Sequence, residues 1–528
     1  MTLKKFPIGI QDFAKIRNEG KYYVDKTDLV YRLTHTHDYC FLSRPRRFGK
    51  SLLVSTLECY FEGRKELFSG LALEHLESEW KKYPVIRLDL SRLKELDEEV
   101  FDANMDSILG RIERNYGIVN DRSDRAWGTR LANLIYSAHE QTGEQVVVLV
   151  DEYDSPVLEA LDDEELLRKI RNRMRDFYAP LKALGGILRF VFLTGISKFS
   201  QLSIFSDLNN LSVITMNDDY AAICGISREE LLTQMRPEIQ ALADKNGLTY
   251  DGACEALQKK YDGYHFSKNS PDIYNPFSLI NALSNGELVS YWFSTGTPTV
   301  LTRLVSKYRM DPEAFVKGFQ AGEEMFDAPT ETATDPLPML YQSGYLTIKK
   351  YKAGEFSPYI LGFPNEEVQD GFTRSLLSYY GNQSSAYMTT ANEIIEGFKT
   401  GDIDRVLKIT RAYLSRIPYD AERPNELHYK TVVYCLFLLI TPYVVRCEEK
   451  SAAGRADVVV ETDTAVYAFE FKLSGNGSAK DALRQIDDKG YLIPYSATRS
   501  ADGTLKKLYR IGVSFDPEKR TIGEWVVG

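Results

Sequence analysis

The chain has 528 residues, 43% of them hydrophobic and 27% charged, which excludes an intrinsically disordered protein. Its length exceeds what one hydrophobic core supports, so we expect two to four domains. The net charge of −10 argues against a protein that coats nucleic acid non-specifically, although a local basic groove is compatible with it.

The cysteines and the apolar segments indicate the compartment. The cysteines are scattered, with no C-x-x-C pair, and are typical of reduced core residues of an intracellular protein. The N-terminus lacks the long apolar segment of a signal peptide. The most apolar run, from Val432 to Val445, is short and contains Pro442, so we expect a buried helix there. We therefore expect a cytoplasmic protein with no membrane partner.

The first motif in chain order is a Gly-Lys-Ser sequence between a strand and a helix. An apolar run from Tyr39 to Leu42 precedes a turn rich in proline and arginine, and a helical pattern follows from Leu52 to Phe61. This arrangement predicts a phosphate-binding loop. We predict that its cofactor-binding residues are Arg46, Arg47, Phe48, Gly49, Lys50 and Ser51. The alternatives are a chance Gly-Lys-Ser and, for the two arginines, a solvated basic turn.

Further strands and helices follow the loop. Residues 85–90 form a strand pattern, residues 95–140 look helical, and residues 146–150 and 188–194 read as strands buried on both faces. A charged helix is expected at residues 162–184. Alternating strands and helices predict a doubly wound α/β domain with a parallel sheet, whose ligands bind at the carboxyl ends of the strands.

Two acids follow the strand at residues 146–150. Asp151 is placed to hold Mg²⁺ together with Ser51, and Glu152 is placed to polarise the attacking water as a catalytic acid. Thr194 and Ser197 end the next strand, where a polar group can sense the γ-phosphate. The alternative for these hydroxyls is a hydrogen bond to the loop backbone.

Residues 216–390 are predicted to form a mostly helical middle region, with one strand pair near residues 345–348 and 359–361. We identify no catalytic constellation there and interpret it as a linker and lid domain. The predicted domains are residues 1–215, 216–390 and 391–528.

The second constellation lies near the C-terminus. A hairpin of residues 456–461 and 466–471 brings Asp457 close to Glu470, and two carboxylates can hold Mg²⁺ and activate a water. Glu470 and Lys472 lie two apart on one strand and share a face. We predict Asp457, Glu470 and Lys472 as catalytic residues; the alternative is an amphipathic hairpin with a surface Glu–Lys pair.

Glu426 is a candidate third metal ligand of this site. The alternative is an acid at a helix start that interacts with the helix dipole. The histidines form no spacing suited to zinc.

Both sites together resemble those of a bacterial family in which an AAA-ATPase-like domain precedes a PD-(D/E)XK nuclease-like domain. Besides the two sites, the resemblance rests on segments at residues 7–13, 23–27, 150–156, 192–200, 261–264 and 341–346. It covers nearly the whole chain, and Arg44 in place of the usual first glycine agrees with this family's loop. The resemblance implies a P-loop NTPase fold followed by a C-terminal α/β, restriction-endonuclease-like domain. It also implies nucleotide-binding roles for Lys50, Ser51, Asp151 and Glu152.

Two functions are consistent with these sites. The first is an ATP-binding and ATP-hydrolysing protein with a Mg²⁺-dependent nuclease domain acting on DNA, in defence against foreign nucleic acid. The second is an ATP-dependent regulatory switch whose C-terminal domain binds a partner or nucleic acid without cleaving it. ATP and Mg²⁺ are the expected cofactors, and a homo-oligomer is left open.

Overall fold

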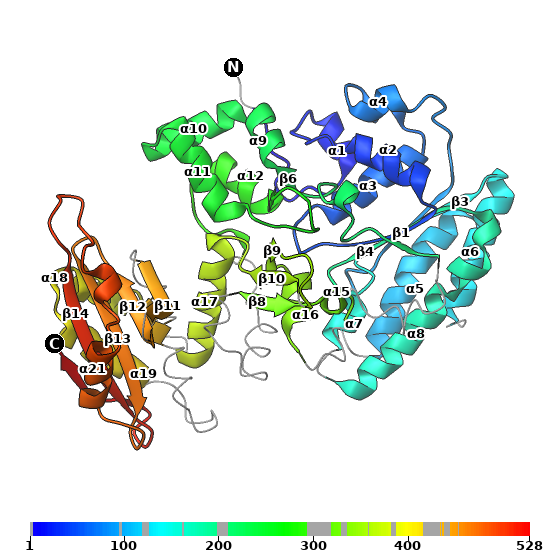
Figure 1. Cartoon of the computed structure of the whole chain (residues 1–528). Coiled ribbons are helices and arrows are strands. Elements are labelled where there is room, and N and C mark those ends of the chain that lie inside the picture. Colours follow the sequence, from blue (N-terminus) through cyan, green and yellow to red (C-terminus); the bar gives the residue numbers. More distant parts are fainter. Residues whose placement is uncertain are drawn as a thin grey trace. The chain divides into compact units, whose positions relative to one another are not determined.

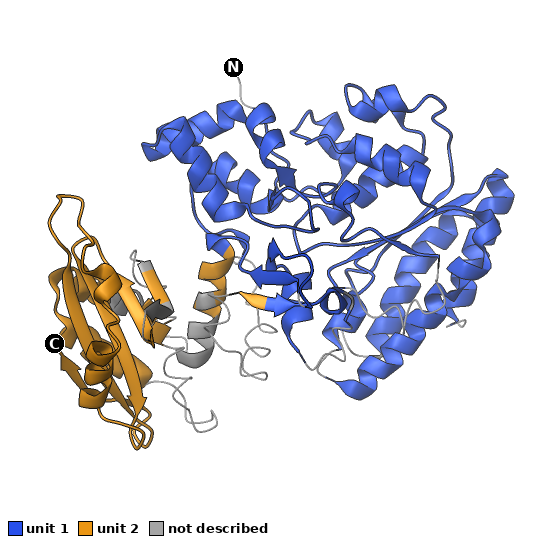
Figure 2. Ribbon diagram, viewed as in Figure 1, with its two compact units in different colours: residues 1–294, 320–367 blue, residues 295–319, 368–528 orange. Residues whose placement is uncertain are grey.

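The computed structural model describes residues 4–93, 98–118, 126–160, 163–197, 210–292, 318–328, 335–356, 358–381, 387–415, 433–434, 436–437, 444–451 and 454–528. The chain divides into two compact units (Figure 2). Unit 1 comprises residues 1–294 and 320–367, and unit 2 comprises residues 295–319 and 368–528. The predicted first domain and most of the predicted middle region thus fall in one unit.

Unit 1 contains a five-stranded parallel sheet, which confirms the predicted fold class (Figure 1). Its strands lie in the order β2 (Val85–Asp89), β3 (Val146–Asp151), β4 (Leu188–Gly195), β1 (Tyr39–Ser43) and β5 (Ser212–Val213). Because the strands are parallel, the carboxyl ends of β1, β3 and β4 meet at one edge.

Helices cover both faces of this sheet. On one face, alternate residues of β3 pack with α5 (Glu98–Asn115), α6 (Trp127–Thr142) and α8 (Glu164–Ala183) in one core. On the other face lies α3 (Lys50–Phe61), where the rings of Phe61 and Phe190 are 5.2 Å apart. Shorter helices complete this part: α1 (Phe13–Asn18), α2 (Thr27–Thr36), α4 (Ala72–Leu76) and α7 (Ser155–Glu159). The predicted helix at 95–140 is therefore two helices, α5 and α6.

The rest of unit 1 is helical with small sheets, in agreement with the predicted character of this region. The helices are α9 (Arg228–Gln234), α10 (Arg236–Asn246), α11 (Tyr250–Tyr261), α12 (Pro276–Asn285), α15 (Glu323–Asp327) and α16 (Leu337–Gln342). The predicted strand pair is confirmed as antiparallel β9 (Thr347–Tyr351) and β10 (Tyr359–Gly362), with β8 (Phe319–Ala321) beside β10. A short antiparallel pair is formed by β6 (Ile226–Ser227) and β7 (Ile273–Tyr274). Helix α17 (Glu366–Gly381) begins in unit 1 and continues into unit 2.

Unit 2 is built on a second five-stranded sheet, which agrees with the predicted C-terminal α/β domain. Its strands lie in sequence order: β11 (Val444–Ser451), β12 (Gly454–Glu461), β13 (Ala465–Leu473), β14 (Lys507–Asp516) and β15 (Thr521–Val527). Only β13 and β14 pair in parallel, and α21 (Ala479–Asp488) connects them. Helices α18 (Tyr387–Thr400) and α19 (Ile403–Leu414) precede the sheet. The predicted apolar helix through Val445 stops earlier, because β11 begins at Val444.

Among the described residues, none of the helices combines the length and apolarity needed to cross a bilayer.

Candidate functional site

The phosphate loop has the predicted strand–loop–helix geometry. Strand β1 ends at Ser43, and α3 begins at Lys50 after Gly49, whose φ of 94° suits glycine. The Lys50 side chain is buried, and its ammonium donates hydrogen bonds to the carbonyl oxygens of Arg44 (2.9 Å) and Pro45 (3.1 Å). In this state the lysine is folded back onto its own loop.

Asp151 at the end of β3 lies beside this lysine. Burial raises the pKa of Asp151, and the nearby Ser51 hydroxyl and Lys50 ammonium oppose that rise. The two predicted Mg²⁺ ligands, Ser51 and Asp151, therefore lie near each other. Burial lowers the pKa of Lys50, and the carboxylates of Asp154, Asp151 and Glu152 oppose it. The attraction between Lys50 and these carboxylates therefore offsets part of the effect that burial has on their pKa values.

A cavity of about 230 Å³ lies between the phosphate loop and the end of β3. Arg46, Gly49, Lys50, Ser51 and Glu152 are among its lining residues. Glu152 has a left-handed backbone (φ 50°), and its amide donates to its neighbour Asp151. A non-glycine residue in this conformation is strained. The strained turn brings the glutamate carboxylate to the cavity that also contains the loop lysine.

Asp154 also lines this cavity, and the sequence interpretation did not assign it a role. It is buried, and one carboxylate oxygen accepts hydrogen bonds from the amides of Ile196 and Ser197 and from the Ser197 hydroxyl. Its other oxygen has no hydrogen-bond partner in the described part of the chain. Asp154 thereby fixes the turn after β4. The available signal was its place three residues after Asp151.

Thr194 lies within the sheet edge. It is fully buried, and its hydroxyl donates at 2.7 Å to the carbonyl of Leu42. This is a backbone hydrogen bond, as in the alternative considered, but its acceptor lies in strand β1 and not in the loop. It does not belong to the described residues that line the cavity. The γ-phosphate sensor role of Thr194 receives no support from this geometry.

The arginines of the loop occupy different environments. Arg44, at the position where phosphate loops carry glycine, is buried, donates to the carbonyls of Ser43, Thr215, Tyr220 and Ala221, and stacks on Phe266 at 4.1 Å. It is therefore a packing residue of the loop.

The guanidinium of Arg47 stacks on Phe277 at 4.2 Å and donates to backbone carbonyls, so its side chain is already engaged within the fold. Arg46 is exposed, whereas Phe48 is buried against Tyr264 and Phe266. Of the two predicted arginine ligands, Arg46 has the more accessible side chain.

A second cavity adjoins the loop and is mostly apolar. It measures about 290 Å³ and shares Gln11, Arg47, Gly49 and Leu52 with the first. Residues from the N-terminal segment, from α3 and from the helical part of unit 1 line it, including Pro7, Ile10, Leu53, Ile223, Met235, Pro276, Phe277 and Ile280. An apolar cavity beside a phosphate cavity matches the two parts of a nucleotide, its base and its phosphates.

In unit 2, the two predicted acids lie on neighbouring strands. Val458 of β12 pairs with Phe469 of β13, and Asp457 and Glu470 adjoin this pair on the same side. Both are buried. One oxygen of Asp457 accepts the Phe471 amide at 2.7 Å, which places this carboxylate beside β13.

Lys472 and two residues that the sequence interpretation missed complete the constellation. The Lys472 ammonium donates to Glu470 at 3.1 Å. Gln485 of α21 donates to the same Glu470 oxygen and, at 2.9 Å, to the Tyr491 hydroxyl. A Cβ at Gly454 would lie 3.0 Å from the Tyr491 ring, so glycine there leaves room for this tyrosine. The amphipathic pattern of α21 is the sequence feature that could have predicted this contact, because it places Gln485 on the side of the helix that faces the sheet.

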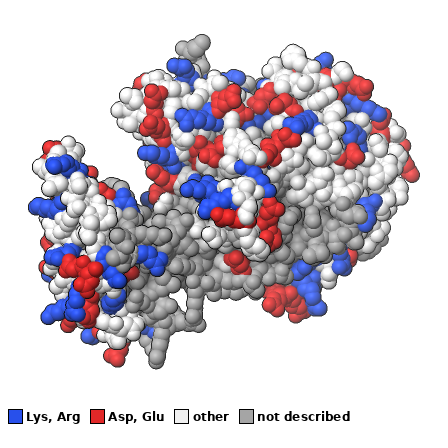
Figure 3. Space-filling view, viewed as in Figure 1, with Lys and Arg blue, Asp and Glu red and all other residues white. Residues whose placement is uncertain are grey.

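The remaining features are Glu426, the predicted third metal ligand, and the charge on the surface of the whole chain. Glu426 lies outside the described residues. Within the described ranges, no group of three or more His, Cys, Asp or Glu residues is placed to hold a metal ion. On the face in Figure 3, Lys and Arg side chains are interspersed with Asp and Glu, in keeping with the net charge of −10.

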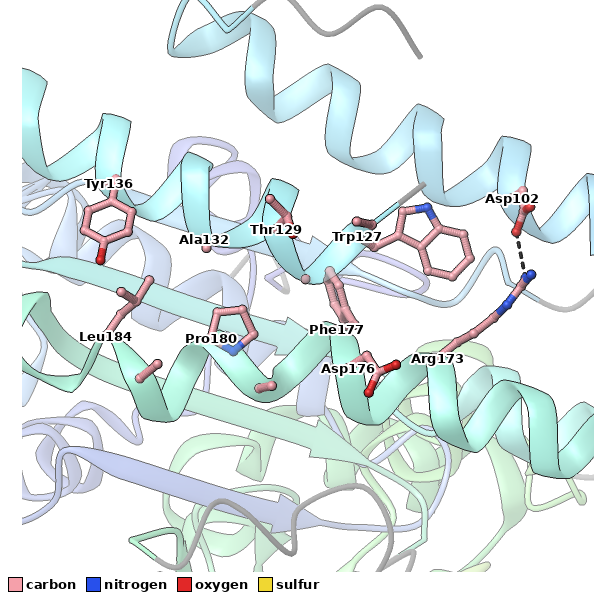
Figure 4. A pocket seen from close by; sticks show the side chains of 14 residues that line it. Asp102, Trp127, Thr129, Ala132, Tyr136, Arg173, Asp176, Phe177, Pro180 and Leu184 are labelled. Carbon is pink, nitrogen blue, oxygen red and sulfur yellow. Dashed lines mark hydrogen bonds and ion pairs between the residues drawn. The ribbon is translucent and has the colours of Figure 1, made fainter. Parts of the chain in front are cut away.

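A further groove of about 640 Å³ lies between α6 and α8 (Figure 4). There Arg173 pairs with Asp102 at 2.8 Å and lies over the Trp127 ring. None of the predicted site residues lines this groove.

Two family models match the regions of the chain that contain the two candidate sites. Residues 7–205 match a family described as a predicted AAA-ATPase, and residues 424–525 match the PD-(D/E)XK nuclease superfamily. A protein of Azotobacter chroococcum mcd 1, named as an uncharacterized protein in the vnfD 5′ region, is 34% identical over 545 residues. That alignment covers 100% of this chain and 99% of the relative.

Proposed function

Because the chain belongs to the family that joins an AAA-ATPase-like domain to a PD-(D/E)XK nuclease-superfamily domain, we propose that it binds and hydrolyses ATP and cleaves DNA. The observation that carries the proposal is that the Asp457 carboxylate of β12 accepts the Phe471 amide of β13, next to Glu470, while Lys472 of β13 donates to Glu470. Defence against foreign nucleic acid is the biological role that we propose for this activity.

The phosphate loop and its cavity support ATP binding. Residues of the loop and of the start of α3 line the cavity, and a helix N-terminus favours anions. On binding, the Lys50 ammonium exchanges two carbonyl acceptors for phosphate oxygens, which are stronger partners because they are charged. The adjoining apolar cavity takes the base.

The donor set at the end of β3 fits Mg²⁺. The Ser51 hydroxyl and the nearby Asp151 carboxylate are oxygen ligands of the kind that this ion takes beside substrate phosphates. Bound there, Mg²⁺ neutralises charge that develops on the phosphates. Glu152 lines the same cavity and orients the attacking water. It accepts the proton of that water as the new bond to the γ-phosphorus forms and the bond to the bridging oxygen breaks, which releases ADP and phosphate.

The constellation in unit 2 supports phosphodiester cleavage. The carboxylates of Asp457 and Glu470, on neighbouring strands, would supply oxygen ligands suited to Mg²⁺, which would lower the pKa of a bound water. Lys472 places an ammonium beside that point and stabilises negative charge on the phosphate. Gln485 holds the Glu470 carboxylate in place.

The experiment incubates the full chain with linear, circular and single-stranded DNA and with RNA. Each substrate is tested with Mg²⁺ or Mn²⁺, with and without ATP, and ATP hydrolysis is measured in parallel. Metal-dependent DNA cleavage supports the proposal. ATP hydrolysis without cleavage of any substrate favours instead the ATP-dependent switch whose C-terminal domain binds without cutting.

A further inference from the structure

The phosphate loop is held by residues far away in the sequence. Pro45 packs against Gly344, where a Cβ would lie 2.6 Å from the proline side chain, and Gly344 has a φ of 86°. The carbonyl of Arg46 accepts the indole N–H of Trp292 at 3.4 Å. The Trp292 ring in turn packs edge-on against Tyr345 at 5.2 Å. The loop conformation therefore depends on the helical part of unit 1.

Arg47 is the residue through which this dependence reaches the loop backbone. Its φ is 66°, a left-handed conformation that non-glycine residues rarely adopt. Its guanidinium stacks on Phe277 and donates to the carbonyls of Tyr291 (3.3 Å) and Trp292 (3.1 Å). Side-chain contacts of this kind offset the cost of a strained backbone. Because phosphate loops bind phosphate through their amides, the contacts of Arg47 also set the orientation of those amides.

Glu367 binds the backbone amides of Tyr291 and Trp292, the two residues whose carbonyls bind Arg47. Its carboxylate is buried, and one oxygen accepts the amides of both Tyr291 and Trp292. The backbone at 291–292 is thus fixed between a guanidinium on its carbonyls and a carboxylate on its amides. The negative charge of Glu367 also favours the charged form of Arg47, which burial opposes.

These residues lie at the points where the chain leaves unit 1. Residues 291–292 precede the passage into unit 2 after residue 294. Glu367 is the last residue of unit 1 in α17, which continues into unit 2. The contacts of Arg47 therefore join the phosphate loop to both of these connections.

We propose that Glu367 and Arg47 are positioning residues for ATP, which act through the backbone of residues 291–292, and that ATP binding reduces the mobility of the backbone at residues 291–292 and at Glu367. These are the two places where the chain leaves unit 1. The proposal rests on the proposed ATP site. Since coupling is reciprocal, contacts that favour the binding conformation of the loop are themselves favoured when nucleotide is bound. Nucleotide state is thereby passed to the segments that lead to unit 2.

The test measures ATP affinity by calorimetry and the rate of ATP hydrolysis for the full chain. Glu367→Ala should weaken ATP binding about tenfold, the effect of one buried hydrogen-bonding group, while changing the turnover number less than about twofold. Glu367→Gln, which keeps the acceptor oxygen, should recover most of the affinity. The exposed neighbour supplies the matched control, Glu366→Ala, which should bind as the wild type does.

Two further readouts separate positioning from general loosening of the fold. In a double-mutant cycle, Arg47→Ala and Glu367→Ala should be non-additive, because both act on residues 291–292. Hydrogen exchange at the amides of residues 291 and 292 should slow when ATP and Mg²⁺ are added to the wild type, and not in Arg47→Ala.

Each outcome bears on one claim. Wild-type affinity in Glu367→Ala, strict additivity, or exchange unaffected by ATP overturns the positioning role. A wild-type chain that binds no ATP overturns the proposed ATP site instead. If Glu367→Ala does not fold, Arg47→Lys decides the question, because lysine keeps the charge but lacks the guanidinium that stacks on Phe277 and donates to the carbonyls of residues 291 and 292. Wild-type ATP affinity together with wild-type exchange at residues 291 and 292 in that variant overturns the positioning role.

Discussion

The ammonium group of Lys50 lies 2.9 Å from the carbonyl oxygen of Arg44, inside its own loop. Lys50→Ala removes the charge that phosphate oxygens would meet, so ATP binding should fall below detection in calorimetry. The exposed Lys65 provides the control Lys65→Ala, which should bind ATP as the wild type does. Unchanged affinity in Lys50→Ala would show that nucleotide binds elsewhere.

Glu152 should matter for hydrolysis more than for binding. Glu152→Gln keeps the size of the side chain and removes the proton acceptor, so ATP affinity should stay near wild type and turnover should fall at least about 100-fold. Turnover is measured by phosphate release, with the exposed Glu164→Gln on α8 as control. Hydrolysis at the wild-type rate would exclude Glu152 as the catalytic residue that accepts the proton of the attacking water.

Asp457→Asn tests the nuclease site with little change of shape, because asparagine still accepts the Phe471 amide. Loss of the charge should abolish metal-dependent DNA cleavage while the thermal unfolding midpoint stays close to that of wild type. Asp463 lies exposed between the same two strands, so Asp463→Asn is the control. Equal cleavage by both variants would contradict the assignment of Asp457.

Gln485 acts through Glu470. Gln485→Ala frees the glutamate carboxylate from its partner on α21, so the Mg²⁺ concentration needed for half-maximal cleavage should rise about 10- to 100-fold. Cleavage is measured against Mg²⁺ concentration, with the exposed Arg484→Ala as control. An unchanged metal requirement would restrict Gln485 to packing.

Asp262 should make stability depend on pH. Burial raises the pKa of this carboxyl from 3.8 to about 6 in the folded chain. The folded state therefore favours the protonated acid, and stability should fall as pH rises from about 4 to 6, by at most about 3 kcal/mol. In Asp262→Asn this fall should shrink, and the unfolding midpoint at pH 7 should rise. Parallel pH profiles for the two proteins would contradict the prediction.

Local sequence determined the elements and the acids of both sites. The apolar runs at 146–150 and 188–194 are long enough, and rich enough in branched and aromatic residues, to predict strands buried on both faces, and they are β3 and β4. Gly49, Lys50 and Ser51 between a strand and a helix predicted the loop. The two-residue spacing of Glu470 and Lys472 predicted their shared face, because side chains alternate along a strand.

Only the tertiary structure decided which partner each side chain takes. The sequence motif does not distinguish Arg44 from a phosphate ligand, and its burial against Thr215, Tyr220, Ala221 and Phe266 depends on residues more than 170 positions away. Gln485 and Tyr491 meet Glu470 because α21 packs on the sheet, and Glu367 meets residues 291–292 across a long sequence separation. Hydrophobic pattern and secondary-structure propensity act over a few neighbouring residues, whereas these contacts arise from the packing of whole elements. For that reason they could not be predicted from the sequence alone.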